Sequence, residues 1–240
     1  MAKSKVVKKV ARSAKPAPTV AKKPARPTKP SLPLPPPPLQ PETRDELAAA
    51  RDIGRLLHYG EKFGSHKIDV RMLPLQLPVA SGALAVCDPG VPKSWRVLDR
   101  PSGSGAFRVM LSIARDGDKQ RLAAIVIHVG RPPIARWTVA HVRGQKRPKS
   151  IDQLPAYAVT TGWFAIADAG DPPGALAVPG DTAPLAPVEI PLADGRRALA
   201  VPSGNGEYAA YWGVDAADKP VCLVVDFDVF TQKEWKAKPT

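Results

Sequence analysis

The clearest hydrophobic pattern in the chain has a period of two. Residues 107–113 place apolar side chains at every second position, which is typical of a half-buried strand. The turn Asp116-Gly117-Asp118 follows, and residues 121–129 return as a second apolar segment. This pattern predicts a β-hairpin in the middle of the chain.

Similar short segments occupy most of the sequence after residue 68. Further strands are predicted at residues 72–79, 83–87, 134–142, 157–167, 188–192, 197–201 and 220–230. Pro74 and Pro78 mark the first of these as an edge or irregular strand. Residues 168–187 read as a long Pro/Gly loop, and we find no internal repeat of fixed period. No helical crossovers separate the strands, so the prediction is all-β: an antiparallel β-sandwich or open barrel.

One amphipathic helix is predicted before the strands. Thr43 and Glu46 form a capping-box pattern, and the helix is expected to end near Tyr59, with Gly60 as the stop signal. The apolar stripe of this helix is partial: Leu47, Ile53, Leu56 and Leu57, interrupted by Gly54. We expect this helix to pack on the domain, with a partner-binding helix as the alternative.

Charge is concentrated at the N-terminus. The chain carries a formal charge of +13, but residues 1–40 hold ten basic residues, no acidic residue and ten prolines, so the remainder is only +3. Such a segment cannot bury enough apolar surface to fold and is predicted to be a disordered tail. The expected domains are the tail at 1–40, a helix and connector at 41–67, and a β-sandwich domain at 68–240.

The tail has two interpretations. It is either a solubilising linker or a weak, non-specific contact for an acidic partner such as nucleic acid. It contains no aromatic residue on which a base could stack. The side chains expected to make electrostatic contacts are Lys8, Lys9, Arg12, Lys22, Lys23 and Arg26.

The sequence also favours a cytoplasmic protein. It has no apolar run long enough for a membrane span and no apolar segment of the secretory type. Cys87 and Cys222 are too few for a disulfide framework and fit a reducing compartment as small core residues.

Catalytic and cofactor motifs are mostly missing. The stretch Gly204 to Ala209 matches G-x-G-x-x-A, with Asp226 about 20 residues later, but no helix follows to hold a pyrophosphate. There is no G-x-S-x-G, H-E-x-x-H, C-x-x-C or Walker A pattern. His128 and His141 lack close ligand spacing, so we assign no metal and no cofactor.

Two carboxylates, Asp226 and Asp228, lie two residues apart on one face of the last predicted strand. Paired carboxylates can perform acid–base chemistry or bind a hard cation. The alternative is that they mark the place where the strand leaves the core.

Three ordered segments carry a family resemblance. They are residues 81–89 (SGALAVCDP), residues 134–137 (IARW), and residues 203–215 with the later Asp226-Phe227 pair. Together, over roughly residues 70–230, they resemble the bacterial family called domain of unknown function 4241. The resemblance implies a predominantly β fold and brings no agreed activity. The chain departs from the family pattern at Glu207-Tyr208, at Ala209 and at residues 159–162.

The resemblance and the residue types single out one set of candidate ligand or interface residues. The set is Asp88, Ser203, Asn205, Glu207, Tyr208, Tyr211, Trp212, Asp215 and Asp226. If their loops meet, the acidic members and Asn205 form a pocket ringed by aromatic side chains. The alternative is that the Asp and Asn side chains cap turns while the aromatic residues fill the core.

Three functional hypotheses remain open. The first is a soluble binding or interaction protein of unknown ligand, with an immunity or regulatory partner as one form. The second is a carboxylate-based hydrolase or metal-dependent enzyme using Asp88, Glu207, Asp215 and Asp226. The third is a non-specific association of the basic tail with nucleic acid.

Overall fold

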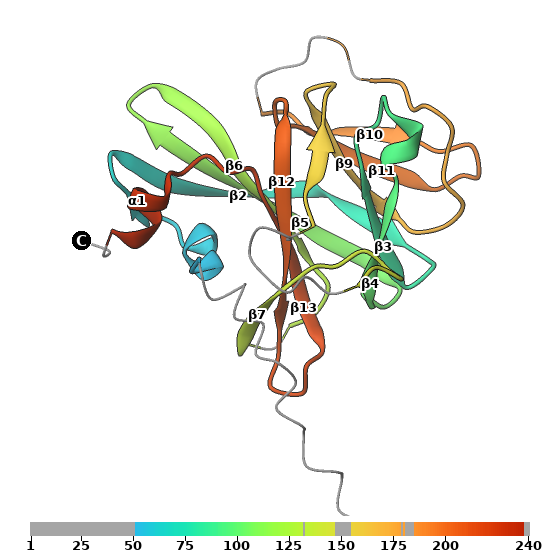
Figure 1. Cartoon of the computed structure of the whole chain (residues 1–240), viewed down its shortest axis with the longest axis horizontal. Coiled ribbons are helices and arrows are strands. Elements are labelled where there is room, and N and C mark those ends of the chain that lie inside the picture. The colour runs from blue at the N-terminus through green and yellow to red at the C-terminus, as the bar shows by residue number, and fades with distance from the viewer. Residues whose placement is uncertain (1–50, 132, 147–154, 179, 181–184, 238–240) are drawn as a thin grey trace, which may run out of the picture. The chain divides into compact units, whose positions relative to one another are not determined.

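The structure, a computed structural model, divides the chain into two units, Met1–Glu42 and Thr43–Thr240. It describes residues 51–131, 133–146, 155–178, 180 and 185–237, all of which belong to the second unit (Figure 1). The basic tail and the first half of the predicted helix therefore lie outside the described residues.

The described residues form two antiparallel sheets (Figure 1). The larger sheet runs in the order β1 (Lys62–Phe63), β2 (His66–Val79), β5 (Gly105–Asp116), β6 (Lys119–His128), β13 (Pro220–Asp226), β12 (Gly206–Val214) and β7 (Arg136–Val139), and β8 (Tyr157–Val159) also pairs with β12. The smaller sheet runs in the order β10 (Val188–Pro191), β11 (Arg197–Pro202), β9 (Trp163–Asp168), β3 (Ala83–Cys87) and β4 (Arg96–Pro101). A bridge between Leu98 and Val142 connects β4 to the segment after β7.

The two sheets form a half-barrel, with 51% of the structure in strands and 8% in helices. This confirms the prediction of a mostly β, antiparallel fold. Antiparallel neighbours need only short connections, which is why Gly, Pro and Asp turns separate the strands.

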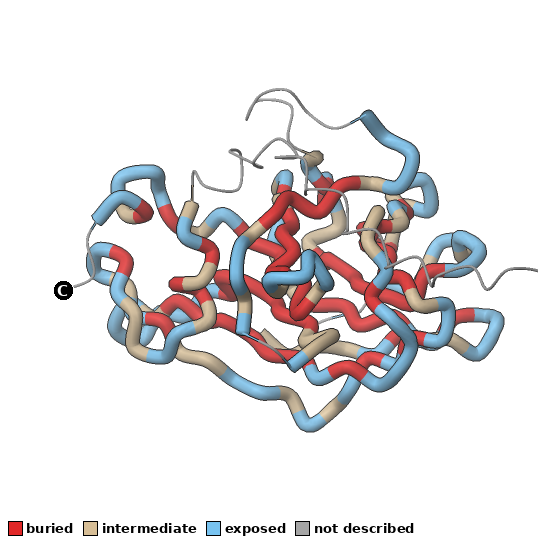
Figure 2. Tube along the Cα trace, turned by 90° about the horizontal axis from the view of Figure 1, so that it is seen from below, coloured by how far each residue is buried: buried red, intermediate tan, exposed pale blue. Residues whose placement is uncertain are grey.

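Apolar side chains form a core between the sheets and a further cluster on the outer face of each one. The inner core takes residues from both sheets, including Leu111, Phe164 and Trp212. Figure 2 shows buried residues along the central strands and exposed residues at the connecting turns. Neighbouring residues on β12 point to opposite faces, so Trp212 enters the inner core while Tyr211 joins the cluster outside the larger sheet.

Helical elements cover the outer face of the larger sheet. The described part of the predicted N-terminal helix contains a 3-10 helix, η2 (Ile53–Leu57), followed by Gly60 with a positive φ of 84°. A short helix that we did not predict, α1 (Gln232–Lys236), begins at Thr231 with a complete capping box. The cluster beneath these helices includes Ile53, Phe63 and Trp235.

Two strand predictions need correction. Residues 157–167 are not one strand, because a turn with Gly162 at φ 80° separates β8 from β9. Residues 206–214 belong to strand β12 and not to a loop. Both faces of β12 are largely buried, so the strand lacks the polar alternation by which we identified others.

The chain contains two copies of one sequence pattern. Residues 79–88 (VASGALAVCD) match 159–168 (VTTGWFAIAD), and residues 96–107 (RVLDRPSGSGAF) match 197–208 (RALAVPSGNGEY). The spacing between the copies changes because the second copy carries a longer segment, with β10, between its two matching parts. A search for a fixed period therefore misses this duplication.

Strand pairing follows the same duplication. Strands β3, β4, β5 and β6 of the first copy correspond to β9, β11, β12 and β13 of the second. Val86 pairs with Ile166, and Val126 pairs with Val224, so equivalent residues of the two copies face each other at the centre of each sheet. A register shift recurs at equivalent places, after Ser112 in β5 and after Gly213 in β12. The described strands therefore have an approximate two-fold relation.

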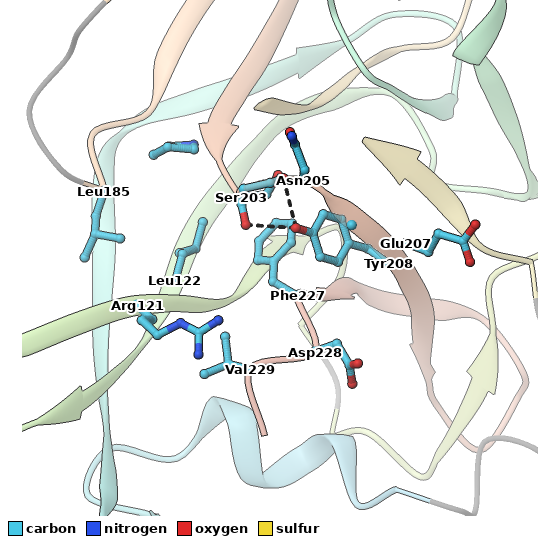
Figure 3. A pocket seen from close by; sticks show the side chains of 13 residues that line it. Arg121, Leu122, Leu185, Ser203, Asn205, Glu207, Tyr208, Phe227, Asp228 and Val229 are labelled. Atoms are coloured by element: carbon cyan, nitrogen blue, oxygen red, sulfur yellow. Dashed lines mark hydrogen bonds between the residues drawn. The ribbon is translucent and has the colours of Figure 1, made fainter. Parts of the chain in front are cut away.

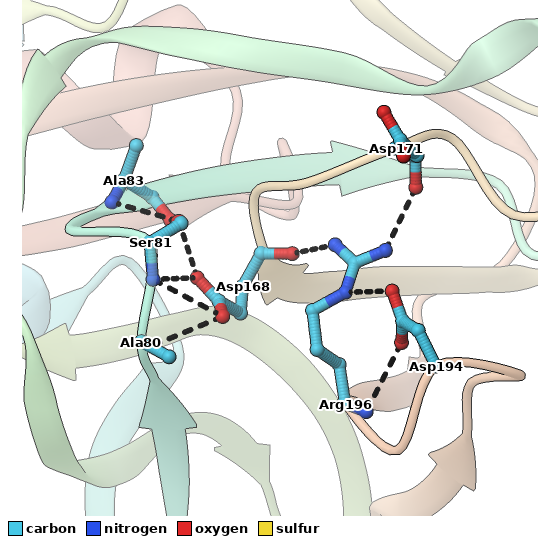
Figure 4. Close-up of polar contacts among 7 residues, drawn as sticks. All are labelled: Ala80, Ser81, Ala83, Asp168, Asp171, Asp194 and Arg196. Carbon is cyan, nitrogen blue, oxygen red and sulfur yellow. Dashed lines mark hydrogen bonds and ion pairs between the residues drawn. The ribbon is translucent and has the colours of Figure 1, made fainter. Parts of the chain in front are cut away.

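A buried carboxylate of each copy holds a turn of the other copy. Asp168, at the end of β9, accepts hydrogen bonds from the Ala80 and Ser81 amides, at 2.9 and 3.0 Å, and from the Ser81 hydroxyl (Figure 4). Asp88, just after β3, accepts from the Thr160 and Thr161 amides, at 2.7 and 3.1 Å. Each turn contains a glycine of positive φ, which favours a residue without a Cβ.

Arg196 fixes the segment that follows Asp168 (Figure 4). Its guanidinium donates to the carbonyls of Asp168 and Asp171, at 2.7 and 2.8 Å, and forms an ion pair with Asp194. This clamp ties the end of β9 to the hairpin between β10 and β11.

We expect Asp168→Ala to lower the free energy of unfolding by about 2–4 kcal/mol, because it leaves two amides and one hydroxyl without their acceptor. Urea denaturation of the full chain measures this change. Asp171→Ala is the matched control, since Asp171 is exposed and contributes its backbone carbonyl to Arg196. Equal stability of the two variants would contradict the capping role of Asp168.

Candidate functional site

An open cavity of about 460 Å³ lies where β6 begins, β12 begins and β13 ends (Figure 3). Its lining is Arg121, Leu122, Leu185, residues 202–208 and residues 227–229. Four of the predicted site residues are among them: Ser203, Asn205, Glu207 and Tyr208.

The loop that forms one wall is held by Tyr208. The Tyr208 hydroxyl donates to the carbonyls of Ser203 and Gly204, both at 2.9 Å (Figure 3). Gly204 has a φ of 80°, and its amide and that of Ser203 donate to the Gly162 carbonyl. Burial raises the pKa of Tyr208, so the hydroxyl stays protonated and keeps its role as a donor at neutral pH. The wall is therefore shaped before any ligand arrives.

The floor of the cavity is apolar and aromatic. Leu122, Tyr208 and Phe227 are 4–5% exposed, and the rings of Tyr208 and Phe227 meet edge to face at 5.0 Å. Phe164 of the inner core packs against both rings. The floor is thus a continuation of the core and is rigid.

Charged side chains stand at the rim. Arg121, Glu207 and Asp228 are exposed, and each contributes to the lining. In Figure 3 Arg121 extends toward residues 227–229, whereas the Glu207 carboxylate is directed away, on the far side of Tyr208. Asp228 has a φ of 50°, an uncommon conformation for a residue with a side chain.

Arg51 joins the two carboxylates at the end of β13. Its guanidinium lies 2.6 Å from Asp226 and 2.8 Å from Asp228. Asp226 also accepts from the Asp228 amide at 2.9 Å and is only 1% exposed. Burial raises the pKa of Asp226, and the nearby Arg51 opposes this shift. This pair of carboxylates therefore binds an arginine of the same chain and marks the end of the strand.

Asp88 lies outside the cavity formed by residues 203–208 and has a structural environment. It is 2% exposed and accepts hydrogen bonds from the amides and hydroxyls of Thr160 and Thr161, and from the Gly90 amide. Burial raises the pKa of Asp88, but the bonds from Thr160 and Thr161 outweigh this effect and leave it below its ordinary value.

The remaining predicted residues are also separated. The Asp215 carboxylate accepts from the Ala217 and Lys219 amides, both at 2.8 Å, in the turn between β12 and β13. Tyr211 and Trp212 are buried on opposite faces of β12. The structure does not bring Asp88, Asn205, Glu207, Asp215 and Asp226 together in one pocket. Asp88 and Asp215 accept hydrogen bonds from backbone amides in separate turns, and Asp226 binds Arg51.

The part of the chain that the structure describes contains no cluster of three or more His, Cys, Asp or Glu residues able to hold a metal ion. None of its helices has the length and apolar character needed to cross a bilayer. Cys87 and Cys222 are both buried and unpaired, and burial raises the pKa of each thiol to about 12.

The sequence analysis did not predict that several residues line this cavity. They are Arg121, Leu122, Leu185, Phe227, Asp228 and Val229. The duplication was an available signal for the loop itself, because it aligns the Tyr208 loop of the second copy with the Phe107 loop of the first. It does not indicate Arg121, whose place beside the second copy depends on the pairing of β6 with β13.

We expect Asp88→Asn to lower the free energy of unfolding by about 2–3 kcal/mol at neutral pH, since charged hydrogen bonds of a buried carboxylate are lost. The folded-state pKa lies below the ordinary value of 3.8. The stabilisation is therefore complete above that pH and is lost as pH falls through the folded-state pKa.

Urea denaturation between neutral pH and pH 2.5 checks this prediction. The difference between the native chain and Asp88→Asn should shrink below pH 3.8. Asp118→Asn, in an exposed turn, is the control and should show no such trend. A difference that stays constant with pH would refute the role of the Asp88 charge.

Comparisons with family models, with curated proteins and with solved structures found no match for this chain. The resemblance to the family called domain of unknown function 4241 therefore stays a prediction.

Proposed function

We propose that this chain is a binding protein and that the cavity beside residues 203–208 is its ligand site. The geometry of this cavity carries the proposal. It combines a volume of about 460 Å³, an apolar aromatic floor and a few polar groups at the rim. Small-molecule sites in proteins have this size, and they combine apolar surface with a few polar groups that orient the ligand.

Differences between the two copies also support a binding role. Asn205, Glu207 and Tyr208 of the second copy stand where the first copy has Ser104, Ala106 and Phe107. The glycines and Pro-Ser of the turn are the same in both copies, so the turn does not need the Asn205 side chain. Tyr208 holds the loop and Glu207 is directed away from the cavity, so Asn205 is the difference that fits recognition of a ligand. An immunity or regulatory role would be a consequence of such binding.

A carboxylate-based reaction has less support. Glu207 is the one member of the proposed catalytic set that lines this cavity. Asp88, Asp215 and Asp226 are each held by hydrogen bonds at other places.

NMR spectra of the isotopically labelled full chain test the site. We expect at least one of a panel of small apolar acids, amines and alcohols to shift the amide signals of residues 203–208 and 227–229. Concentrations of about 1–10 mM are appropriate, because a small ligand gains only a limited free energy per atom.

Residues 102–107 serve as an internal control, since they form the equivalent loop of the first copy. Shifts confined to the second copy would support the site. Equal shifts in both loops, or no shift from any compound, would mean that the cavity is not a ligand site.

A second candidate function belongs to the tail, whose charge of ten basic residues in forty favours nucleic-acid association. We expect deletion of residues 1–40 to abolish binding to duplex DNA, because the remaining chain carries only +3. Fluorescence anisotropy at two salt concentrations measures this. Binding that survives the deletion, or does not weaken with salt, would argue against the tail.

A further inference from the structure

The rim of the cavity holds one cation without a partner. Arg121 is exposed at the start of β6, and its guanidinium has no hydrogen-bond or ion-pair partner within the described residues. It nevertheless stands close enough to Tyr208 to lower the pKa of that hydroxyl, partly offsetting the rise caused by burial. Arg121 is thus available to a ligand that occupies the space over the Tyr208 ring.

Neither carboxylate at the rim, that of Asp228 or that of Glu207, forms an ion pair with Arg121. Asp228 is bound by Arg51 at 2.8 Å. Glu207 is directed away from the cavity, on the far side of Tyr208 (Figure 3). A guanidinium binds a carboxylate through two parallel N–H groups, which is the arrangement that Arg121 leaves open.

The charge balance favours a ligand with a single negative charge. A dianion such as phosphate would bring a second negative charge close to Asp228 and to the buried Asp226. A monoanion is matched by Arg121 alone. The neutral amide of Asn205 adds a hydrogen-bonding group at the same rim without changing the charge.

The floor of the cavity indicates that the rest of the ligand is apolar. Leu122, Phe227 and the Tyr208 ring present buried apolar surface, and Val229 is half-buried beside them. The Tyr208 hydroxyl is already used by two carbonyls and therefore contributes no free donor to the floor. An apolar ligand group that rests on this floor removes its own surface from water and finds no unsatisfied polar group there.

We propose that the cavity binds an apolar group that carries one carboxylate, with Arg121 as the counter-ion. This inference rests on the proposed function and names the ligand class of the same site. The carboxylate belongs either to a small organic acid or to the free C-terminus of a peptide that ends in an apolar residue.

Three compounds with the same apolar group test the ligand class: 3-phenylpropionate, 3-phenylpropylamine and 3-phenylpropanol. Titration of the full chain by NMR should show that the acid binds most tightly, through shifts at residues 203–208. Arg121→Gln should weaken binding of the acid roughly tenfold and leave that of the alcohol unchanged.

Lys219→Gln is the matched control, because Lys219, exposed just before β13, is the residue of the second copy that corresponds to Arg121 in the duplicated sequence. It should leave all three affinities unchanged. Acetyl-Gly-Gly-Phe and its C-terminal amide then distinguish the two sources. Tighter binding of the free peptide acid than of 3-phenylpropionate identifies a peptide terminus, and weaker binding identifies a small acid.

Two results would overturn the inference. If the amine or the alcohol binds at this site as tightly as the acid, or if Arg121→Gln does not affect the acid, the ligand class is wrong while the binding site stands. If none of these compounds shifts residues 203–208, the ligand class fails, and the proposed function fails with it only when the wider panel also gives no shift.

Discussion

The fold depends on two buried carboxylates that each hold a turn of the opposite copy. Asp88 follows β3 and Asp168 ends β9, and these two strands pair with each other within the smaller sheet. Both carboxylates are only 2% exposed, and a buried carboxylate is costly unless it accepts hydrogen bonds, which the turn of the other copy supplies through its N–H groups. Neither copy can complete this arrangement alone. The reciprocal bonds therefore link local turn geometry to the pairing of the two copies.

Duplication also explains how one protein obtains both a stable frame and a variable site. The two-fold relation places the same turn, Pro-Ser-Gly-x-Gly, at two positions in the described strands. In both places a glycine adopts the positive φ that the turn requires: 76° at Gly103 and 80° at Gly204. Because the frame is secured by the glycines, the intervening residues are free to differ. The second copy uses that freedom for Asn205, whereas Tyr208, after the second glycine, holds the loop through its hydroxyl.

Much of the fold was predictable because many strands are short apolar segments bounded by Gly, Pro and Asp turns. The predicted segments at 83–87, 107–113 and 197–201 all lie in strands. Prediction failed at β12, where both faces are covered, one by the inner core and one by the cluster around η2 and α1. A strand of this kind carries no alternation from which its two faces could be read.

The candidate site was only partly predictable, and for a different physical reason. The Ser203 to Tyr208 loop could be identified because its residues are adjacent in sequence and chemically distinctive. Asp88, Asp215 and Asp226 were equally distinctive, yet the structure uses them to satisfy backbone amides and Arg51. Residue type alone cannot distinguish an acceptor for the protein's own backbone from an acceptor for a ligand.

The same distinction decides which side chains of the cavity are available for recognition. The Tyr208 hydroxyl donates to two carbonyls, and the Asp228 carboxylate forms an ion pair with Arg51, so both side chains shape the wall of the cavity. Arg121 has no hydrogen-bond or ion-pair partner of this kind in the described part of the chain. The apolar floor beside Arg121 is already formed, so binding there requires little ordering of the floor itself. Recognition at this site should therefore depend on Arg121, the cation of the rim that has no ion pair within the described residues.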